Sequence, residues 1–213
     1  MSSSDAFKNL SPTTLADVLG GDQVMDSGIR PQWSFPSLTR VVGPAFTVRC
    51  APGDNLMLHA ALYRAEPGSV IVVESGDLRS ALAGGNVCAI AERRGIAAFV
   101  LDGLIRDLAE VRALGFPVFA RGVIPCAGAK AAVAPLGQPV QCGGVAVHPG
   151  DIVVADEEGI VVVPHADADA VRQAAQAKLV AEADLSLDAW EQDHRAAVDQ
   201  ALRAGGFEES PHA

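Results

Sequence analysis

The sequence GIAAFVLDGLIRDLAEVRALGFPVFARG at residues 95–122 predicts a strand, a helix and a second strand in close succession. Residues 96–101 form an uninterrupted apolar run of strand length, which is typical of a strand covered on both faces. Apolar side chains then recur at three-residue spacing over residues 108–114, and Gly115 supplies a left-handed stop for this helix. Residues 116–120 are apolar again and complete a compact strand–helix–strand unit.

Three charged side chains lie in the turn between the first strand and the helix, namely Asp102, Arg106 and Asp107. In open α/β sheets, ligands collect at the carboxyl ends of strands and beside helix N-termini. A cation and two carboxylates at such a place predict a polar site for a small anion, with Asp107 as a candidate ligand for Mg²⁺ or Mn²⁺. A simpler interpretation is that Asp107 caps the helix and Arg106 is a solvated surface residue. Asp102 would then shape a turn with Gly103.

The rest of the chain also alternates between predicted strands and helices. Strands are expected at residues 45–50 and 69–74, each followed by a helix. After the central unit, the sequence predicts short β segments and then a long polar helix that begins at Asp167. This order favours an α/β fold or a layered β/β/α sandwich, with a helical tail at the C-terminus. The short β segments are residues 139–147, 151–155 and 159–163.

Composition limits the classes of function. The chain has 213 residues, of which 49% are hydrophobic, and this length can bury one sizeable core. Its formal net charge of −10 argues against extended contact with nucleic acid. No apolar run approaches the roughly 20 residues of a membrane span. The four cysteines lie far apart without a CxxC pair, which favours reduced thiols in a cytoplasmic protein over structural zinc or disulfides.

A second candidate site is the run Gly84-Gly85-Asn86-Val87-Cys88, which precedes a predicted helix. Glycines at a helix N-terminus let a ligand approach the backbone closely, and the N–H groups that lack partners there bind anions. The alternative interpretation is that Asn86 is an ordinary N-cap after a flexible turn. Cys88 has no activating base nearby in the sequence, which argues against a nucleophilic thiol.

Two longer stretches resemble a known family. Residues 84–122, GGNVCAIAERRGIAAFVLDGLIRDLAEVRALGFPVFARG, are similar to the core of the RraA-like family. This family includes the 4-hydroxy-4-methyl-2-oxoglutarate / 4-carboxy-4-hydroxy-2-oxoadipate aldolases. Residues 148–171, HPGDIVVADEEGIVVVPHADADAV, resemble its later segment. The resemblance implies a swivelling-domain-like β/β/α sandwich over residues 1–184, a C-terminal helical extension over residues 185–213, and assembly as homotrimers or homohexamers with active sites between subunits.

The family aldolases are class II pyruvate aldolases, so the resemblance also implies a small 2-oxo-acid substrate and Mg²⁺ or Mn²⁺ as cofactor. Asp107 would hold the metal, with Asp102 as a possible outer-shell ligand. Arg106 would bind pyruvate and stabilise its enolate. Backbone N–H groups of residues 85–88 would bind the pyruvate carboxylate, and Glu182 would be an acid supplied by a neighbouring subunit. Oxaloacetate decarboxylation is an expected side activity, because it leaves the same enolate.

The sequence departs from the family pattern where aldolases often carry a second metal-associated acid, because Gly85-Asn86 stands there instead. No lysine lies in residues 95–122, so a Schiff-base mechanism has no carrier in the central unit. The alternative function is that of a non-catalytic regulator of ribonuclease E, since some family members resemble such protein-binding regulators. In those members the acid after the arginine can be lost. This chain retains Arg106-Asp107, which favours an enzyme.

Overall fold

The computed structural model describes residues 3–32, 40–183 and 185–207. The chain divides into two compact units, Met1–Ala175 and Gln176–Ala213. This division lies within helix α5 (Ala168–Ala183), N-terminal to the boundary after residue 184 that the sequence suggested.

The first unit is built on a large sheet, which has eight strands among the described residues. Strands β2, β3, β5 and β6 run parallel to their neighbours at its centre, while β9 and β10 extend one side in antiparallel pairing. The order is β1-β6-β5-β3-β2-β9-β10, and β4 pairs with β5 outside this path. The strands are β1 (Arg30–Pro31), β2 (Val41–Arg49), β3 (Val70–Glu74), β4 (Ala81–Ala83), β5 (Ala98–Ile105), β6 (Val118–Val123), β9 (Ile152–Asp156) and β10 (Gly159–Val163).

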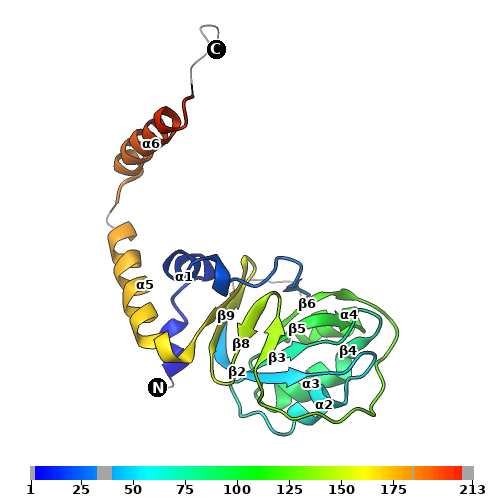
Figure 1. Ribbon diagram of the computed structural model, residues 1–213. Coiled ribbons are helices and arrows are strands. Elements are labelled where there is room, and N and C mark those ends of the chain that lie inside the picture. The colour runs from blue at the N-terminus through cyan, green and yellow to red at the C-terminus, as the bar shows by residue number, and fades with distance from the viewer. Residues whose placement is uncertain (1–2, 33–39, 184, 208–213) are drawn as a thin grey trace. The chain divides into compact units, whose positions relative to one another are not determined.

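Both faces of the large sheet are covered, which explains the continuous apolar runs of its central strands. Ile71 and Val73 of β3 face a core shared with helices α2 (Leu56–Ala61), α3 (Gly85–Arg93) and α4 (Leu108–Leu114). The alternate residues Val70 and Val72 face a second core, shared with the two-stranded sheet of β7 (Val140–Cys142) and β8 (Val145–Val147). Figure 1 shows the three helices and strand β8 on opposite sides of the large sheet. The predicted β/β/α layering is therefore confirmed.

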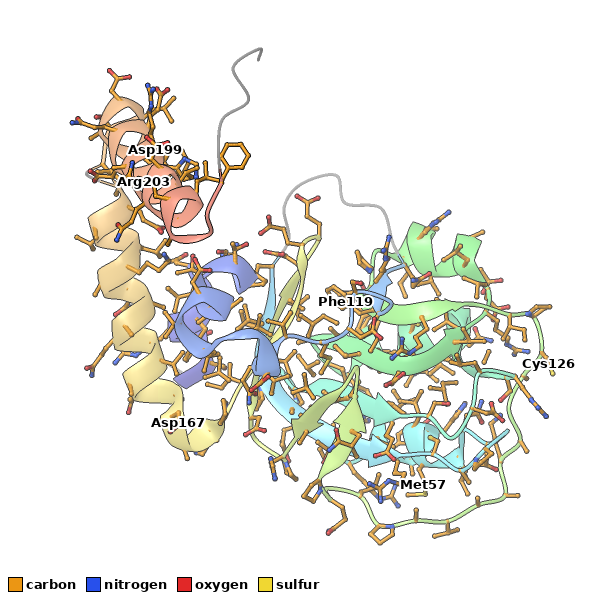
Figure 2. All side chains as sticks on the ribbon, turned by 45° about the horizontal axis from the view of Figure 1, so that its top comes forward. Met57, Phe119, Cys126, Asp167, Asp199 and Arg203 are labelled. Carbon is orange, nitrogen blue, oxygen red and sulfur yellow. The ribbon has the colours of Figure 1, made fainter. Side chains whose placement is uncertain are left out.

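Side chains fill the space between these layers (Figure 2). Phe119 of β6 is fully buried in the second core, and Met57 of α2 is buried in the first. Cys126 is exposed, whereas the other three cysteines are buried as free thiols. Short helices flank the layers: η1 (Ser3–Phe7), α1 (Pro12–Leu19), η2 (Gly21–Gln23) and η3 (His165–Asp167).

The second unit contains the end of α5 and helix α6 (Leu187–Ala204), so the predicted C-terminal helical tail is confirmed. Ser186 begins α6 as an N-cap, and its hydroxyl accepts a hydrogen bond from the Ala189 N–H at 3.2 Å. The Trp190 and His194 rings stack on this helix with centroids 4.5 Å apart. Within the described ranges, no helix has the length and hydropathy needed to cross a membrane.

One predicted boundary in the central unit is wrong. The first strand does not end at Asp102-Gly103 but continues to Ile105, with an irregular register against β6 between Leu101 and Leu104. The extension exists because β4, where the sequence predicted no strand, pairs with the end of β5. Gly103 permits this packing, since a Cβ there would lie 2.6 Å from Leu82 Cδ1. The longer strand carries the following Arg-Asp pair to the carboxyl end of the parallel strands.

Candidate active site

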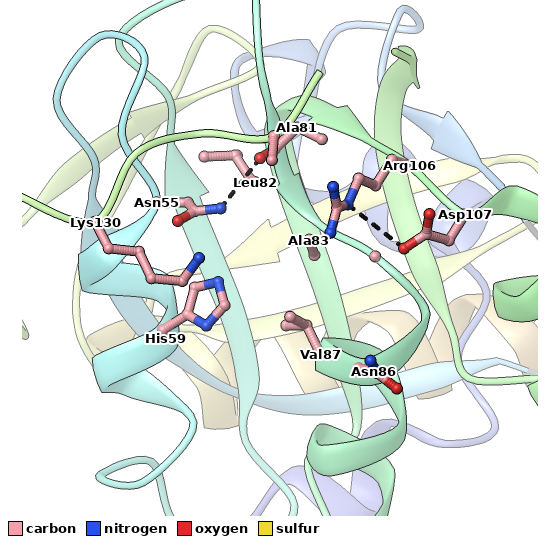
Figure 3. A pocket seen from close by; sticks show the side chains of 12 residues that line it. Asn55, His59, Ala81, Leu82, Ala83, Asn86, Val87, Arg106, Asp107 and Lys130 are labelled. Atoms are coloured by element: carbon pink, nitrogen blue, oxygen red, sulfur yellow. Dashed lines mark hydrogen bonds and ion pairs between the residues drawn. The ribbon is translucent and has the colours of Figure 1, made fainter. Parts of the chain in front are cut away.

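A pocket lies where β5 ends, between α2, the N-terminus of α3 and residues 127–130 (Figure 3). Its volume is about 60 Å³. A single water molecule needs a cavity of roughly 10–15 Å³, so a pocket of this volume suits a small acid rather than a nucleotide. The pocket is lined by Asn55, His59, Ala81, Leu82, Ala83, Gly84, Asn86, Val87, Arg106, Asp107, Ala127 and Lys130.

Asp107 has a left-handed backbone, with φ 55° and ψ 42°, and no other non-glycine residue in the described part of the chain has a positive φ. It occupies the N-cap position of α4, but its side chain does not cap that helix. Instead, its Oδ2 accepts a hydrogen bond from the Gly85 N–H at 3.2 Å and lies 3.5 Å from Arg106 Nε. Backbone strain of about 1 kcal/mol is typical of functional residues. The interpretation of Asp107 as a simple helix cap is therefore wrong.

Arg106 extends along the same wall of the pocket as Asp107 (Figure 3). Its backbone N–H donates to the Ala83 carbonyl at 3.0 Å, which fixes the chain between β4 and β5. Its side chain is 44% exposed, so the guanidinium can reach a ligand. Gly84 makes room for both side chains, since a Cβ there would lie 2.3 Å from Asp107 Oδ2 and 2.9 Å from Arg106 Cγ.

The N-terminus of α3 offers fewer free donors than the sequence predicted. The Gly85 N–H binds Asp107, and the Cys88 N–H donates to the Gly84 carbonyl at 3.0 Å within the helix. No hydrogen bond among the described residues engages the N–H groups of Asn86 and Val87, and both residues line the pocket. The N-cap is Gly84 and not Asn86. The predicted anion site is thus reduced to the N–H groups of Asn86 and Val87.

Cys88 does not line the pocket, and its side chain is fully buried in the core. Burial raises the pKa of its thiol to about 12, and the nearby Asp107 carboxylate acts in the same direction. The predicted substrate contact of Cys88 is therefore not supported, because its N–H is used by the helix and its side chain points into the core. The thiol is also not the reactive thiolate that a nucleophile would require.

Glu110 is a carboxylate at this site that sequence reasoning missed. A Cβ on Gly85 would lie only 2.0 Å from Glu110 Oε2, so the Glu110 side chain fills the space beside Gly85. Asp107 reaches the backbone of the same glycine. Two carboxylates therefore converge there, although residue 85 itself carries none. The available signal was spacing, since Glu110 lies three residues after Asp107 and thus on the same side of helix α4.

Three further residues that the sequence did not assign to the site form the other wall of the pocket. His59 comes from α2, and Asn55 directly precedes this helix. Lys130 comes from the segment between β6 and β7. Burial lowers the pKa of His59, and the Lys130 ammonium lowers it further. Asn55 is 4% exposed, and its amide donates to the Ala81 carbonyl at 3.2 Å.

Comparison with known proteins gives these residues a family context. Residues 4–162 match the RraA-like family, described as Aldolase/RraA. The chain belongs to the RraA-like family. An RraA-like relative from Halalkalibacterium halodurans is 41% identical over 173 residues, which cover 81% of each chain, and is named "Putative 4-hydroxy-4-methyl-2-oxoglutarate aldolase".

Solved structures agree with this assignment. A crystal structure of an uncharacterized protein from Pseudomonas syringae is 32% identical with a TM-score of 0.75, covering 85% of this chain and 84% of that one. RraAS2 from Streptomyces coelicolor, described as an unusual member of the RNase ES inhibitor RraA protein family, is 29% identical with a TM-score of 0.71. It covers 91% of this chain and 95% of that one.

Asp102 and Glu182, like Gly85 and Cys88, are predicted site residues that do not line the pocket. Asp102 binds Arg121 Nε through Oδ1 and accepts a hydrogen bond from the Gly143 N–H at 2.8 Å through Oδ2. Both of its oxygens are therefore engaged away from Asp107, which leaves its predicted outer-shell role without support. Glu182 lies in the second unit, where it forms an ion pair with Lys178 at 2.7 Å. Its contribution to a neighbouring subunit's site stays a prediction.

The donor set of the site fits a hard divalent cation. Among the described residues, no group of three or more His, Cys, Asp and Glu side chains is arranged to hold a metal. Asp107 and Glu110 nevertheless supply carboxylate oxygens beside Gly85, and no hydrogen bond or ion pair in the described ranges engages Asp107 Oδ1. Mg²⁺ and Mn²⁺ prefer oxygen ligands, and Mg²⁺ commonly keeps several waters while it binds one or two carboxylates.

Proposed function

We propose that this RraA-like protein is a divalent-metal-dependent class II pyruvate aldolase. Its substrate is 4-hydroxy-4-methyl-2-oxoglutarate or a related 4-hydroxy-2-oxo acid, which it cleaves to pyruvate, and it also decarboxylates oxaloacetate. The observation that carries the proposal is the strained Asp107 beside Arg106, facing the free N–H groups at the start of α3. The name of the Halalkalibacterium halodurans relative supports the same activity.

Both reactions leave the enolate of pyruvate, and the pocket has a group for each part of that anion. The N–H groups of Asn86 and Val87 bind the carboxylate, at the positive end of the α3 dipole. The Arg106 guanidinium donates hydrogen bonds to the oxygen that becomes negatively charged, which stabilises the transition state more than the substrate. Asp107 and Glu110 would hold Mg²⁺ or Mn²⁺, and this cation supplies Lewis acidity at the carbonyl oxygen when bound.

The proposal includes a homo-oligomer, a trimer or a hexamer, in which Glu182 completes the site of a neighbouring subunit. Glu182 is exposed in the second unit, as such a role requires.

Pyruvate release tests this proposal directly. With Mg²⁺, we expect turnover of 4-hydroxy-4-methyl-2-oxoglutarate and of oxaloacetate, after subtraction of the uncatalysed decarboxylation. EDTA should abolish both activities and added Mg²⁺ or Mn²⁺ should restore them, since the carboxylates alone cannot polarise the carbonyl group. The folded Asp107→Ala variant should be inactive and should show weaker Mn²⁺ binding by electron paramagnetic resonance. Turnover that persists in EDTA would rule out the proposed mechanism.

The alternative function is that of a protein-binding regulator of a ribonuclease, and one comparison favours it. The Streptomyces coelicolor neighbour is described as belonging to a family of ribonuclease inhibitors. Absence of turnover on both substrates, in folded protein supplied with Mg²⁺, would favour this alternative. Retention of Asp107 in a strained conformation favours the enzyme.

A single methyl group at residue 84 should disturb the site without disturbing the fold. Gly84 has an extended backbone, with φ −155° and ψ −169°, that alanine adopts freely. The Cβ of Gly84→Ala would displace the Asp107 carboxylate, so we expect a loss of about 10- to 100-fold in metal-dependent turnover. Gly21→Ala is a matched control, because a Cβ there meets no atom within 4 Å. Equal turnover of the two variants would show that the position of Asp107 is unimportant.

A further inference from the structure

The pocket has a cationic wall that the proposed chemistry does not use. Figure 3 shows Lys130 and His59 side by side, across the pocket from Arg106 and Asp107. Lys130 is one of only three lysines in the sequence. A lysine is a point charge with rotatable donors, and in a pocket it binds an anionic group.

Backbone hydrogen bonds hold Lys130 in place. The buried Asp54 carboxylate accepts hydrogen bonds through Oδ2 from the N–H groups of the two residues that follow Lys130, at 2.6 and 3.1 Å. On the other side of Lys130, Ala129 donates its N–H to the Gly53 carbonyl at 2.7 Å and accepts from the Asn55 N–H at 2.8 Å. The lysine is thus anchored to the turn before α2, and its position over the pocket is not that of a loose loop.

The charges at the site favour a ligand with two anionic groups. Arg106 and Lys130 contribute two cations to the lining, whose one carboxylate is Asp107, and Glu110 adds a second carboxylate beside Gly85. Within the described ranges, no carboxylate forms an ion pair with Lys130, although Asp54 lies near enough to interact with it. His59 adds no negative charge. A divalent cation held by Asp107 and Glu110 would offset these two carboxylates and leave the two positive charges of Arg106 and Lys130 for the ligand, in a protein whose net charge is −10. A monocarboxylate such as pyruvate leaves Lys130 without a partner.

We infer that Lys130 binds the second carboxylate of the substrate, so that the enzyme selects 2-oxo dicarboxylates over 2-oxo monocarboxylates of the same chain length. This inference rests on the proposed function, because it places the first carboxylate at Asn86 and Val87 and the 2-oxo group at Arg106. Lys130 is then a specificity-determining residue rather than a group that takes part in bond cleavage. Asp54 is a positioning residue that acts through Lys130.

Calorimetric titration in the presence of Mg²⁺ tests the inference with two ligands that cannot undergo aldol cleavage. 2-Oxoglutarate and 2-oxopentanoate have equal chain length and differ in the second carboxylate. Wild-type protein should bind 2-oxoglutarate about 10- to 100-fold more tightly, as expected for hydrogen bonds between charged groups. Lys130→Met should remove this difference by weakening 2-oxoglutarate alone, while Lys130→Arg should restore part of it.

Two controls separate this inference from the proposed function. Lys8→Met removes an exposed lysine that does not line the pocket and should leave both affinities unchanged. Pyruvate should bind equally well to wild type and to Lys130→Met, because it uses only the opposite wall. If pyruvate binds but the preference for 2-oxoglutarate is absent, or is unchanged in Lys130→Met, the role of Lys130 is refuted and the aldolase proposal stands. If pyruvate binds to neither protein, both proposals fall.

Discussion

Replacement of Arg106 by alanine is expected to lower the rate of pyruvate formation about 10²- to 10³-fold. The guanidinium lies beside the strained Asp107 and faces the free N–H groups of Asn86 and Val87, so a 2-oxo acid held by those groups presents its carbonyl oxygen to Arg106. Negative charge grows on this oxygen as the enolate forms. The lost hydrogen bonds therefore matter most in the transition state, and the fall should be in kcat more than in KM.

Steady-state kinetics with oxaloacetate and Mg²⁺ would measure this effect. The fold should persist, since Arg106 is exposed and its backbone N–H still donates to Ala83. Arg93→Ala is the matched control, because Arg93 is an exposed arginine in the last turn of α3 and does not line the pocket. A folded Arg106→Ala protein with the kcat of the control would remove Arg106 from the mechanism.

The sequence predicted the layers of the fold because its signals there are local. The apolar run of β3 is covered on both faces, and the turn residues around it are glycines and prolines. The end of β5 could not be predicted in this way. Asp102-Gly103 has the composition of a turn, yet the strand continues because β4 pairs with it and Gly103 leaves space for Leu82. A long-range pairing overrode the local preference of the chain.

The same distinction between local signals and long-range contacts explains which site residues the sequence predicted. Arg106, Asp107, Asn86 and Val87 lie where a strand end meets a helix N-terminus, and the family resemblance implied that they form one site. Lys130 was missed because nothing near it in the sequence indicates that a distant buried carboxylate binds the neighbouring backbone. Glu110 was missed for a different reason. The family pattern places the second acid where this chain has Gly85-Asn86, whereas the structure brings a carboxylate beside Gly85 from the next helix.

Replacement of Asp54 by alanine is expected to destabilise the first unit by about 2–4 kcal/mol and to release the segment that carries Lys130. Asp54 is 5% exposed and accepts three backbone hydrogen bonds, including one from the Leu56 N–H at 2.8 Å that starts α2. Each hydrogen bond to a charged group contributes about 1.5–3 kcal/mol, and their losses are not additive. Asp54→Asn should lose less stability than Asp54→Ala, because the amide oxygen of asparagine can still accept some of these hydrogen bonds. Urea unfolding at pH 7 would measure both changes.

The pH dependence of this effect identifies the carboxylate as its source. Burial alone would raise the pKa of Asp54, but the three N–H donors and the Lys130 ammonium outweigh burial and hold the pKa below its ordinary value of 3.8. A carboxyl group with a lowered pKa in the folded state stabilises the protein above its ordinary pKa, and this contribution is lost as the pH falls through the folded value. The difference in unfolding free energy between wild type and Asp54→Ala should therefore narrow below about pH 4. A difference that stays constant down to pH 2.5 would mean that packing, and not the ionised carboxylate, anchors Lys130 over the pocket.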